Sequence, residues 1–135
     1  MRIRFDHIMM HTTDMQKSID FLREVVGMEL ENTDEYIDFR LAYMINKETN
    51  IKFELREVYG QEKQENGAVI GHFAFYVDDV AQIILRFEKY CKQNMINLAN
   101  KFEEHVSEKH SKMYHIFTCF SPDGIEISFL QKVRG

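Results

Sequence analysis

The chain has 135 residues, of which 44% are hydrophobic and 29% charged, and its net charge is −5. This composition is typical of a globular protein, and the length suits one compact domain better than two independent ones. No dense cluster of Lys and Arg occurs, which disfavours binding to nucleic acid or to an anionic membrane surface. Without a long apolar run or a secretory signal, we expect a cytoplasmic protein that has no membrane span and keeps Cys91 and Cys119 as reduced thiols.

The first half of the chain predicts the order strand, helix, strand, strand, strand. A β-rich apolar run from about residue 3 to residue 10 predicts the first strand. Residues 12–14 offer side chains that cap helices, apolar residues recur at helical spacing over residues 15–26, and Gly27 tolerates a positive φ at the helix end. Three strands are then expected over residues 28–32, 36–45 and 50–59, with turn-prone residues between them, including Asn32-Thr33-Asp34.

The second half predicts the same order again. The polar stretch GQEKQENG, residues 60–67, is expected to be a loop or linker. A strand follows, then Asp78 or Asp79 as the helix cap and a helix over residues 80–94. The strands are expected over residues 69–77, 96–104, 113–120 and 124–131.

An internal duplication is the strongest organisational signal in the sequence. A shift of 65 places His7 on His72 and Asp14 on Asp79, and a shift of 74 places residues 50–55 on residues 124–129. We expect the larger second shift to reflect a longer connection in the second half, around residues 105–112. The chain is therefore predicted to be a single domain, 1–135, made of two βαβββ repeats over about 1–60 and 67–135.

The duplication gives the histidines a candidate role. If the two copies pack about a pseudo-twofold axis, His7 and His72 face each other from the first strands, and Glu54 and Ser128 complete the set from the last strands. Imidazole and carboxylate groups are common ligands of divalent metals. A lone histidine at a strand start is more often a surface or hydrogen-bonded residue, but its recurrence in both repeats favours a metal site.

Four segments of the chain resemble the vicinal oxygen chelate superfamily, which includes glyoxalase I, extradiol dioxygenases and metal-free bleomycin-binding proteins. They are DHIMMHTTDMQKSIDFLREVVGMEL, IKFELREVYG, GHFAFYVDDV and SPDGIEISF, and their layout is most similar to that of glyoxalase I. The resemblance implies an α+β fold in which two paired βαβββ modules form a cupped mixed sheet around a divalent metal. It also implies a homodimer, in which the site is often shared between chains.

Carried over position by position, the resemblance matches three of the four metal ligands of glyoxalase I, namely His7, Glu54 and His72. At the fourth position, where the family has a glutamate that also moves the substrate proton, this chain has Ser128. His11 replaces an arginine expected to bind glutathione, and Val58 replaces a polar glutathione contact. These departures argue against glutathione as part of the substrate.

Two residues are candidates to replace the missing glutamate. If Ser121-Pro122-Asp123-Gly124 is a hairpin turn, Phe117 lies opposite Ser128, and His115 then shares the face of Ser128 from a diagonal position, within reach of a long or aromatic side chain. Its imidazole would suit proton transfer at neutral pH. Glu126 shares that face two residues along the strand. The commoner interpretation of either residue is structural: a half-buried strand histidine and a solvated charge.

The first functional hypothesis is a glyoxalase I-like metal-dependent lyase or isomerase. It would act on a small substrate with vicinal oxygens, stabilise an enediolate-like intermediate on the metal, and use His115 or Glu126 as the base. Zinc, nickel, cobalt, manganese and iron all suit the ligand set. The alternative is a metal-free module of the bleomycin-resistance type that sequesters a small molecule, which Ser128 favours. A ring-cleaving dioxygenase is a weaker third hypothesis, because its ligands are expected within one module.

Overall fold

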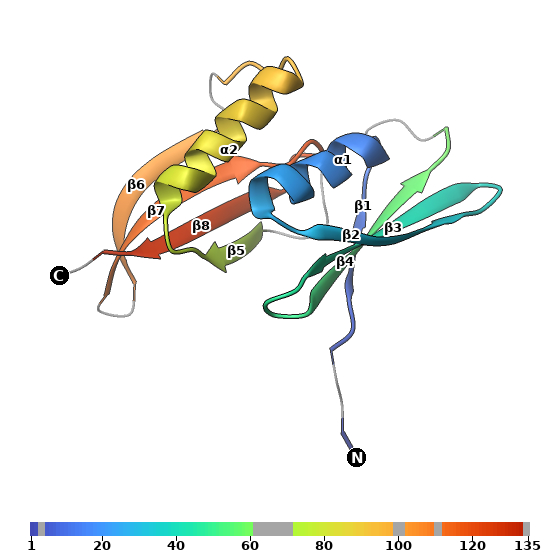
Figure 1. The fold of residues 1–135 in the computed structure, drawn as a ribbon, viewed down its shortest axis with the longest axis horizontal. Coiled ribbons are helices and arrows are strands. Elements are labelled where there is room, and N and C mark those ends of the chain that lie inside the picture. Colours follow the sequence, from blue (N-terminus) through green and yellow to red (C-terminus); the bar gives the residue numbers. More distant parts are fainter. Residues whose placement is uncertain (3–4, 61–71, 99–101, 110–111, 134–135) are drawn as a thin grey trace. The chain divides into compact units, whose positions relative to one another are not determined.

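The computed structural model describes residues 1–2, 5–60, 72–98, 102–109 and 112–133, and the chain divides into two compact units, Met1–Ala68 and Val69–Gly135. Most of the predicted linker, residues 61–67, lies outside the described residues. Each unit has the order βαβββ, which confirms the predicted fold class (Figure 1). The first unit contains β1 (Ile8–His11), α1 (Met15–Phe21), a π-helical turn η1 (Leu22–Val26), β2 (Glu29–Glu35), β3 (Phe39–Asn46) and β4 (Ile51–Val58). The second contains β5 (His72–Tyr76), α2 (Val80–Gln93), β6 (Phe102–Lys109), β7 (Lys112–Phe120) and β8 (Glu126–Lys132).

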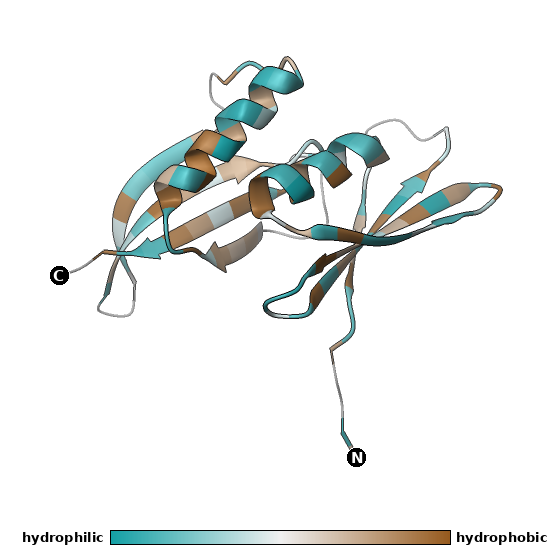
Figure 2. Ribbon diagram, viewed as in Figure 1, coloured by the Kyte–Doolittle hydropathy of each residue, from teal (hydrophilic) through white to brown (hydrophobic). Residues whose placement is uncertain are grey.

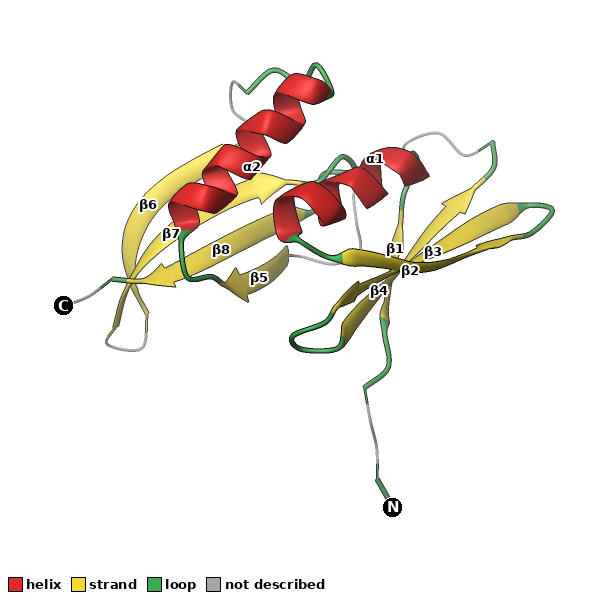
Figure 3. Cartoon of the chain, in the orientation of Figure 1, coloured by secondary structure: helices red, strands yellow, loops and turns green. Residues whose placement is uncertain are grey.

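Each unit holds its own four-stranded mixed sheet, with the strand order β1-β4-β3-β2 in the first and β5-β8-β7-β6 in the second. The first and last strands of each unit are parallel neighbours, and the other pairs are antiparallel (Figure 3). Ile8 pairs with Phe53 and Phe73 pairs with Ile127, so the pairing of these strands reproduces the shifts of 65 and 74. The duplication found in the sequence is therefore a duplication of structure.

The helices begin and end where the capping residues predict. Asp14 accepts a hydrogen bond from the Lys17 amide at 3.1 Å, and Asp79 accepts one from the Ala81 amide at 3.0 Å. Both caps satisfy amide groups that have no partner inside the helix. At the other end of the first helix, Gly27 adopts a φ of 84°, which a residue with a side chain rarely adopts.

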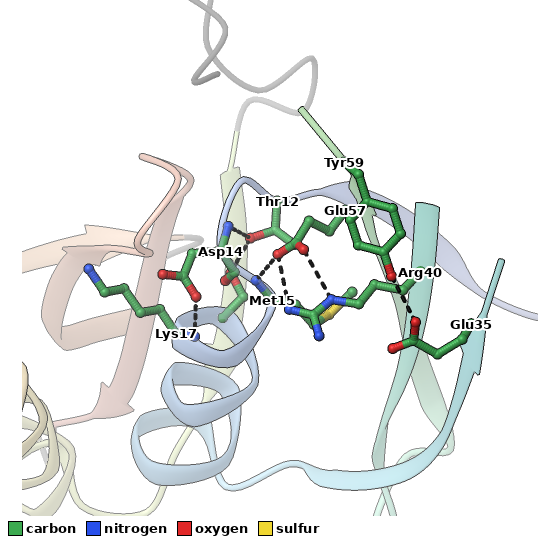
Figure 4. A network of polar contacts seen from close by, with 9 residues as sticks. Thr12, Asp14, Met15, Lys17, Glu35, Arg40, Glu57 and Tyr59 are labelled. Carbon is green, nitrogen blue, oxygen red and sulfur yellow. Dashed lines mark hydrogen bonds and ion pairs between the residues drawn. The ribbon is translucent and has the colours of Figure 1, made fainter. Parts of the chain in front are cut away.

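A side chain from the last strand of each unit also binds the start of the helix. The amide of Met15 donates to a carboxylate oxygen of Glu57, and the amide of Val80 donates to the side-chain oxygen of Gln131 at 2.8 Å. These contacts occupy equivalent places in the two units. Glu57 differs from Gln131 by its charge, and it also pairs with Arg40 at 3.0 Å (Figure 4).

The equivalence of Glu57 and Gln131 predicts that two substitutions at Glu57 will differ in their effect on stability. Glu57→Ala removes the acceptor of a backbone amide and the partner of Arg40, so we expect the free energy of unfolding to fall by about 1–3 kcal/mol. Glu57→Gln keeps an oxygen for the amide, as Gln131 does, and is expected to cost less. Urea denaturation of both variants measures the difference. Equal losses would show that the Arg40 pair, and not the helix contact, carries the effect.

The core of each unit lies between its helix and one face of its sheet. Hydrophobic and hydrophilic residues are interspersed along the strands (Figure 2), as expected for sheets with one buried face. Fully buried side chains include Phe21, Met44, Phe53, Phe117 and Phe129. Both cysteines are buried, and burial raises the pKa of Cys119 to about 12. The Cys119 thiol therefore stays protonated and unreactive at neutral pH.

Two strands are longer than predicted. β2 continues through Asn32-Thr33-Asp34, which the sequence predicted as a turn, because pairing with β3 outweighs the local preference of those residues. β6 includes residues 105–109, where a longer connection was predicted, because those residues pair with β7. The extra length of the second unit lies mainly after the helix: residues 94–101 connect α2 to β6, whereas residues 27–28 connect η1 to β2.

The predicted register of the last hairpin was wrong by one residue. Thr118 and not Phe117 pairs with Ser128, and Phe120 pairs with Glu126. The connection is five residues, 121–125, closed by a hydrogen bond from the Ser121 amide to the Ile125 carbonyl at 2.9 Å. Since side chains alternate between faces along a strand, a one-residue change moves each side chain to the opposite face of the sheet.

Candidate functional site

The first unit brings two of the predicted ligand side chains together. His7 immediately precedes β1, and Glu54 lies on the neighbouring strand β4. His7 Nε2 is 2.8 Å from Glu54 Oε2, with the Glu54 side chain largely buried. An imidazole nitrogen and a carboxylate oxygen that converge on one point fit two positions in the coordination shell of a divalent metal.

Asp6 holds the other ring nitrogen of His7. Its Oδ2 atom is 2.7 Å from His7 Nδ1, and this hydrogen bond raises the pKa of His7, with Glu54 adding to the effect. A carboxylate on the far nitrogen of a metal-binding histidine fixes the ring orientation and the tautomer. The sequence analysis did not identify Asp6, although an acidic residue next to a candidate ligand was a signal that could have been used.

A cavity of about 350 Å³ opens beside this pair, within the first unit. Asp6, Glu31, Asp34 and Glu54 contribute carboxylates to its wall, and Lys52 pairs with Glu31 at 3.0 Å. Burial, followed by the nearby Glu54 charge, raises the pKa of the Tyr43 hydroxyl in the same wall. The excess of acidic groups makes the cavity favourable for a cation.

The second unit places the other candidates around β8. Ser128 shares a hydrogen bond with Thr118, with their hydroxyl oxygens 2.8 Å apart. Glu126 is the Cα partner of His72 across the parallel pair β5 and β8. Adjacent strands are about 4.8 Å apart, so the backbones of these two residues are immediate neighbours. The side chain of His72 lies outside the described residues, and among those described no group of three or more His, Cys, Asp or Glu side chains converges on one point.

Comparison of the sequence with known proteins identifies the family to which the chain belongs. The sequence profile of the Glyoxalase/Bleomycin resistance protein/Dioxygenase superfamily matches residues 4–129. The chain belongs to this superfamily. Lactoylglutathione lyase of Neisseria meningitidis is 30% identical over 98% of the chain and 94% of the relative. The lactoylglutathione lyase of Escherichia coli O157:H7 is 37% identical over 59% of the chain and 62% of the relative.

Solved structures of the superfamily agree with the fold. Glyoxalase I from Zea mays matches 97% of this chain with a TM-score of 0.74 and 22% identity, although the chain spans only 45% of that maize chain. A glyoxalase family protein from Bacillus cereus matches 99% of this chain and 97% of its own with a TM-score of 0.72 and 15% identity. At these identities the structures support the glyoxalase-like fold alone.

The structure removes the argument that made His115 a candidate for the site. His115 was placed beside Ser128 because Phe117 was predicted to lie opposite Ser128. In the structure His115 pairs with Gln131, and its Nε2 atom is 2.6 Å from Glu104. It therefore lies on the face of the sheet that carries Gln131, and Ser128 lies on the other. The register moves His115 away from Ser128 and leaves Glu126 on the face of Ser128.

Arg56 is a polar residue near the His7 and Glu54 pair that the sequence analysis did not single out. It lies two residues after Glu54 on β4, so the two side chains share the face of the sheet that is not covered by α1. Its guanidinium carbon is 4.4 Å from the centre of the Phe39 ring. The spacing of two residues from a candidate ligand on a predicted strand was the signal that could have found it.

Proposed function

We propose that the protein is a metal-dependent lyase or isomerase of the glyoxalase I type that acts on a small substrate with vicinal oxygens. The observation that carries the proposal is the contact of His7 Nε2 with Glu54, with Asp6 on the other ring nitrogen. His7 and Glu54 would hold the metal together with His72. A divalent ion bound there would polarise the two substrate oxygens and acidify the adjacent C–H bond.

We also propose Glu126 as the base, in place of the glutamate that Ser128 replaces. Its backbone pairs with that of His72, and its strand position shares the face of Ser128. In this role a carboxylate oxygen of Glu126 would take the proton from the substrate carbon and return it to the neighbouring carbon, while the hydroxyl proton moves from the oxygen of the first carbon to that of the second. The substrate is isomerised with no net change in protons, so the reaction needs no further reactant.

The Glu126 assignment predicts a loss of turnover with an intact fold. Glu126→Gln is expected to lower the rate of proton exchange between hydroxyacetone and D2O, followed by NMR on the metal-loaded protein, by roughly 100- to 10,000-fold, the usual contribution of a general base. The metal content of the variant should not change. Glu88→Gln, at an exposed position on α2, is the matched control. An undiminished exchange rate in Glu126→Gln would remove Glu126 from this role.

A homodimer is part of the proposal on the strength of the family resemblance, and the cytoplasmic location expected from the sequence is kept with it. The described helices are all too short or too polar to span a membrane. Sedimentation of the full chain at several concentrations would measure the oligomeric state.

The test of the proposed function is the metal content of the purified full chain, measured by elemental analysis before and after chelation and after reloading. Zinc, nickel, cobalt, manganese and iron(II) should be offered separately. One metal ion per chain, removed by the chelator and regained on reloading, is expected. Failure to retain any of the five ions would overturn the proposal.

Ser128 supports one alternative function, a metal-free module that sequesters a small molecule. A hydroxyl group is a poor ligand for a divalent ion, and Ser128 is already hydrogen-bonded to Thr118. This module would bind its ligand with equal affinity before and after chelation, whereas the proposed enzyme would lose affinity for vicinal-oxygen ligands when the metal is removed.

A further inference from the structure

Arg56 occupies a distinctive place on the sheet face that carries Glu54. Its Cα partners are His11 on β1 and Leu41 on β3. Arg56 therefore lies between the exposed imidazole of His11 and the aliphatic side chain of Leu41. Lys52 and Arg56 each lie two residues from Glu54 on this face, but Lys52 already pairs with Glu31 at 3.0 Å.

The Arg56 side chain is stacked on an aromatic ring, and its Nε atom lacks an acceptor among the described residues. Its guanidinium lies over the Phe39 ring, and Tyr36 stacks on that ring with centroids 4.6 Å apart. Stacking of this kind orients the planar guanidinium. Its Nε atom is buried and has no hydrogen-bond partner among the described residues. A buried donor without an acceptor costs free energy, so such a group in a native fold requires an explanation.

Arg40 shows the usual arrangement in the same sheet. It pairs with Glu57 through Nε at 3.0 Å, on the face that α1 covers. Arg56 has no equivalent carboxylate within 4.0 Å among the described residues, although Glu54 is close in sequence. The Glu54 carboxylate instead contacts His7. The Arg56 guanidinium lies over Phe39, whose Cα partner on β4 is Val58.

We propose that Arg56 binds an anionic group of the substrate and that the substrate is a small carboxylate that also carries the two vicinal oxygens. This inference rests on the proposed function. The Cα atoms of residues 54 and 56 are about 7 Å apart on an extended strand, so one small substrate could reach both the metal ligands and the guanidinium. One guanidinium matches one carboxylate, which it binds through two parallel hydrogen bonds that include Nε.

The first test examines Arg56 without any metal. Succinate is titrated into the metal-free full chain, and the Nε–Hε resonance of Arg56, assigned by its loss in Arg56→Lys, is followed by NMR. A saturable downfield shift is expected as Nε gains an acceptor. Inorganic phosphate is titrated in parallel, and a larger or tighter response to phosphate would overturn the carboxylate assignment. No shift with either anion would overturn the anion site.

The second test examines the substrate class on the metal-loaded protein. Acetohydroxamate offers two vicinal oxygens alone, and succinate monohydroxamate adds a carboxylate. We expect the second compound to bind on the order of 10-fold more tightly to the wild type, and Arg56→Gln to abolish that advantage while leaving the affinity for acetohydroxamate unchanged. Arg23→Gln, at an exposed position on η1, is the matched control.

The outcomes separate the two proposals. Equal affinities of the two hydroxamates for the wild type would overturn the inference about Arg56 and leave the metal site intact. An Arg56→Gln variant that keeps the preference for the carboxylate would do the same. If neither hydroxamate binds while succinate still shifts the Arg56 resonance, the metal-dependent function fails and the anion site stands.

Discussion

Replacing His7 with Ala, or Glu54 with Gln, is expected to weaken metal binding by more than about 100-fold. Loss of an outer partner of a metal ligand typically costs 10- to 100-fold in affinity, and loss of a ligand itself costs more. Because His7 and Glu54 contact each other directly, each variant removes one of two converging donors. Competition with a chromophoric chelator, with the protein loaded with cobalt or zinc, measures the change.

Two controls define what this result would mean. Asp6→Asn is expected to lose less affinity than either ligand variant, since Asp6 contacts only the far nitrogen of His7. His105→Ala removes an exposed histidine on β6 and should leave the affinity unchanged. Full metal affinity in both His7→Ala and Glu54→Gln would exclude this pair from the site.

Phe117→Ala is expected to produce the largest loss of stability among core substitutions in the second unit. Phe117 is fully buried, and its ring lies 5.6 Å from those of Phe87 and Phe102 and 6.4 Å from that of Phe129. Truncating such a residue removes apolar contacts and leaves a cavity, at a cost of about 3–5 kcal/mol. For a chain of this length the melting temperature should fall by roughly 10–20 °C.

Phe120→Ala is the matched control for that prediction. Phe120 lies on the same strand but is 42% exposed, so its truncation removes fewer contacts and opens no closed cavity. Thermal and urea denaturation of the two variants should differ by at least about 2 kcal/mol. Similar losses in both variants would show that the aromatic cluster around Phe117 is not the main source of stability in this unit.

Local signals were sufficient to predict the helices and the order of the elements. Asp14, Asp79 and Gly27 act through the chain immediately beside them, and the structure confirms all three as helix termini. The repeat of the same pattern in both halves then indicated the fold class, because two matching βαβββ units leave few ways to pair the strands.

Strand lengths and register depend on partners that are distant in sequence. Asn32, Thr33 and Asp34 have turn preferences, but they pair with β3 and remain in β2. The last hairpin differs from the prediction by a single residue. Its connection has five residues and not the predicted four, so Thr118 lies opposite Ser128. That one residue moved His115 to the face where it contacts Glu104. The alternation of apolar and polar residues cannot distinguish the two registers, because either register gives the hairpin one mostly apolar face.

The candidate site was predictable only in part for the same reason. His7 and Glu54 were selected because the duplication and the family resemblance indicated them, and the structure places them in contact. Asp6 and Arg56 matter through their relation to those two residues, as a ring-nitrogen partner and as a neighbour on the same face. Such relations become visible only when the strands are paired.

The contact between the last strand and the start of the helix has a consequence for how the two halves can diverge. Glu57 and Gln131 each bind the helix of their own unit, so each repeat completes its own internal bonding. A repeat of this kind can exchange residues on its uncovered face without loosening its own framework or that of its twin. The contrast between Glu54 in one repeat and Ser128 in the other is such an exchange. Two repeats of one structural plan can thus have unequal roles, one with a carboxylate and the other with a hydroxyl at the equivalent position, while the scaffold stays the same.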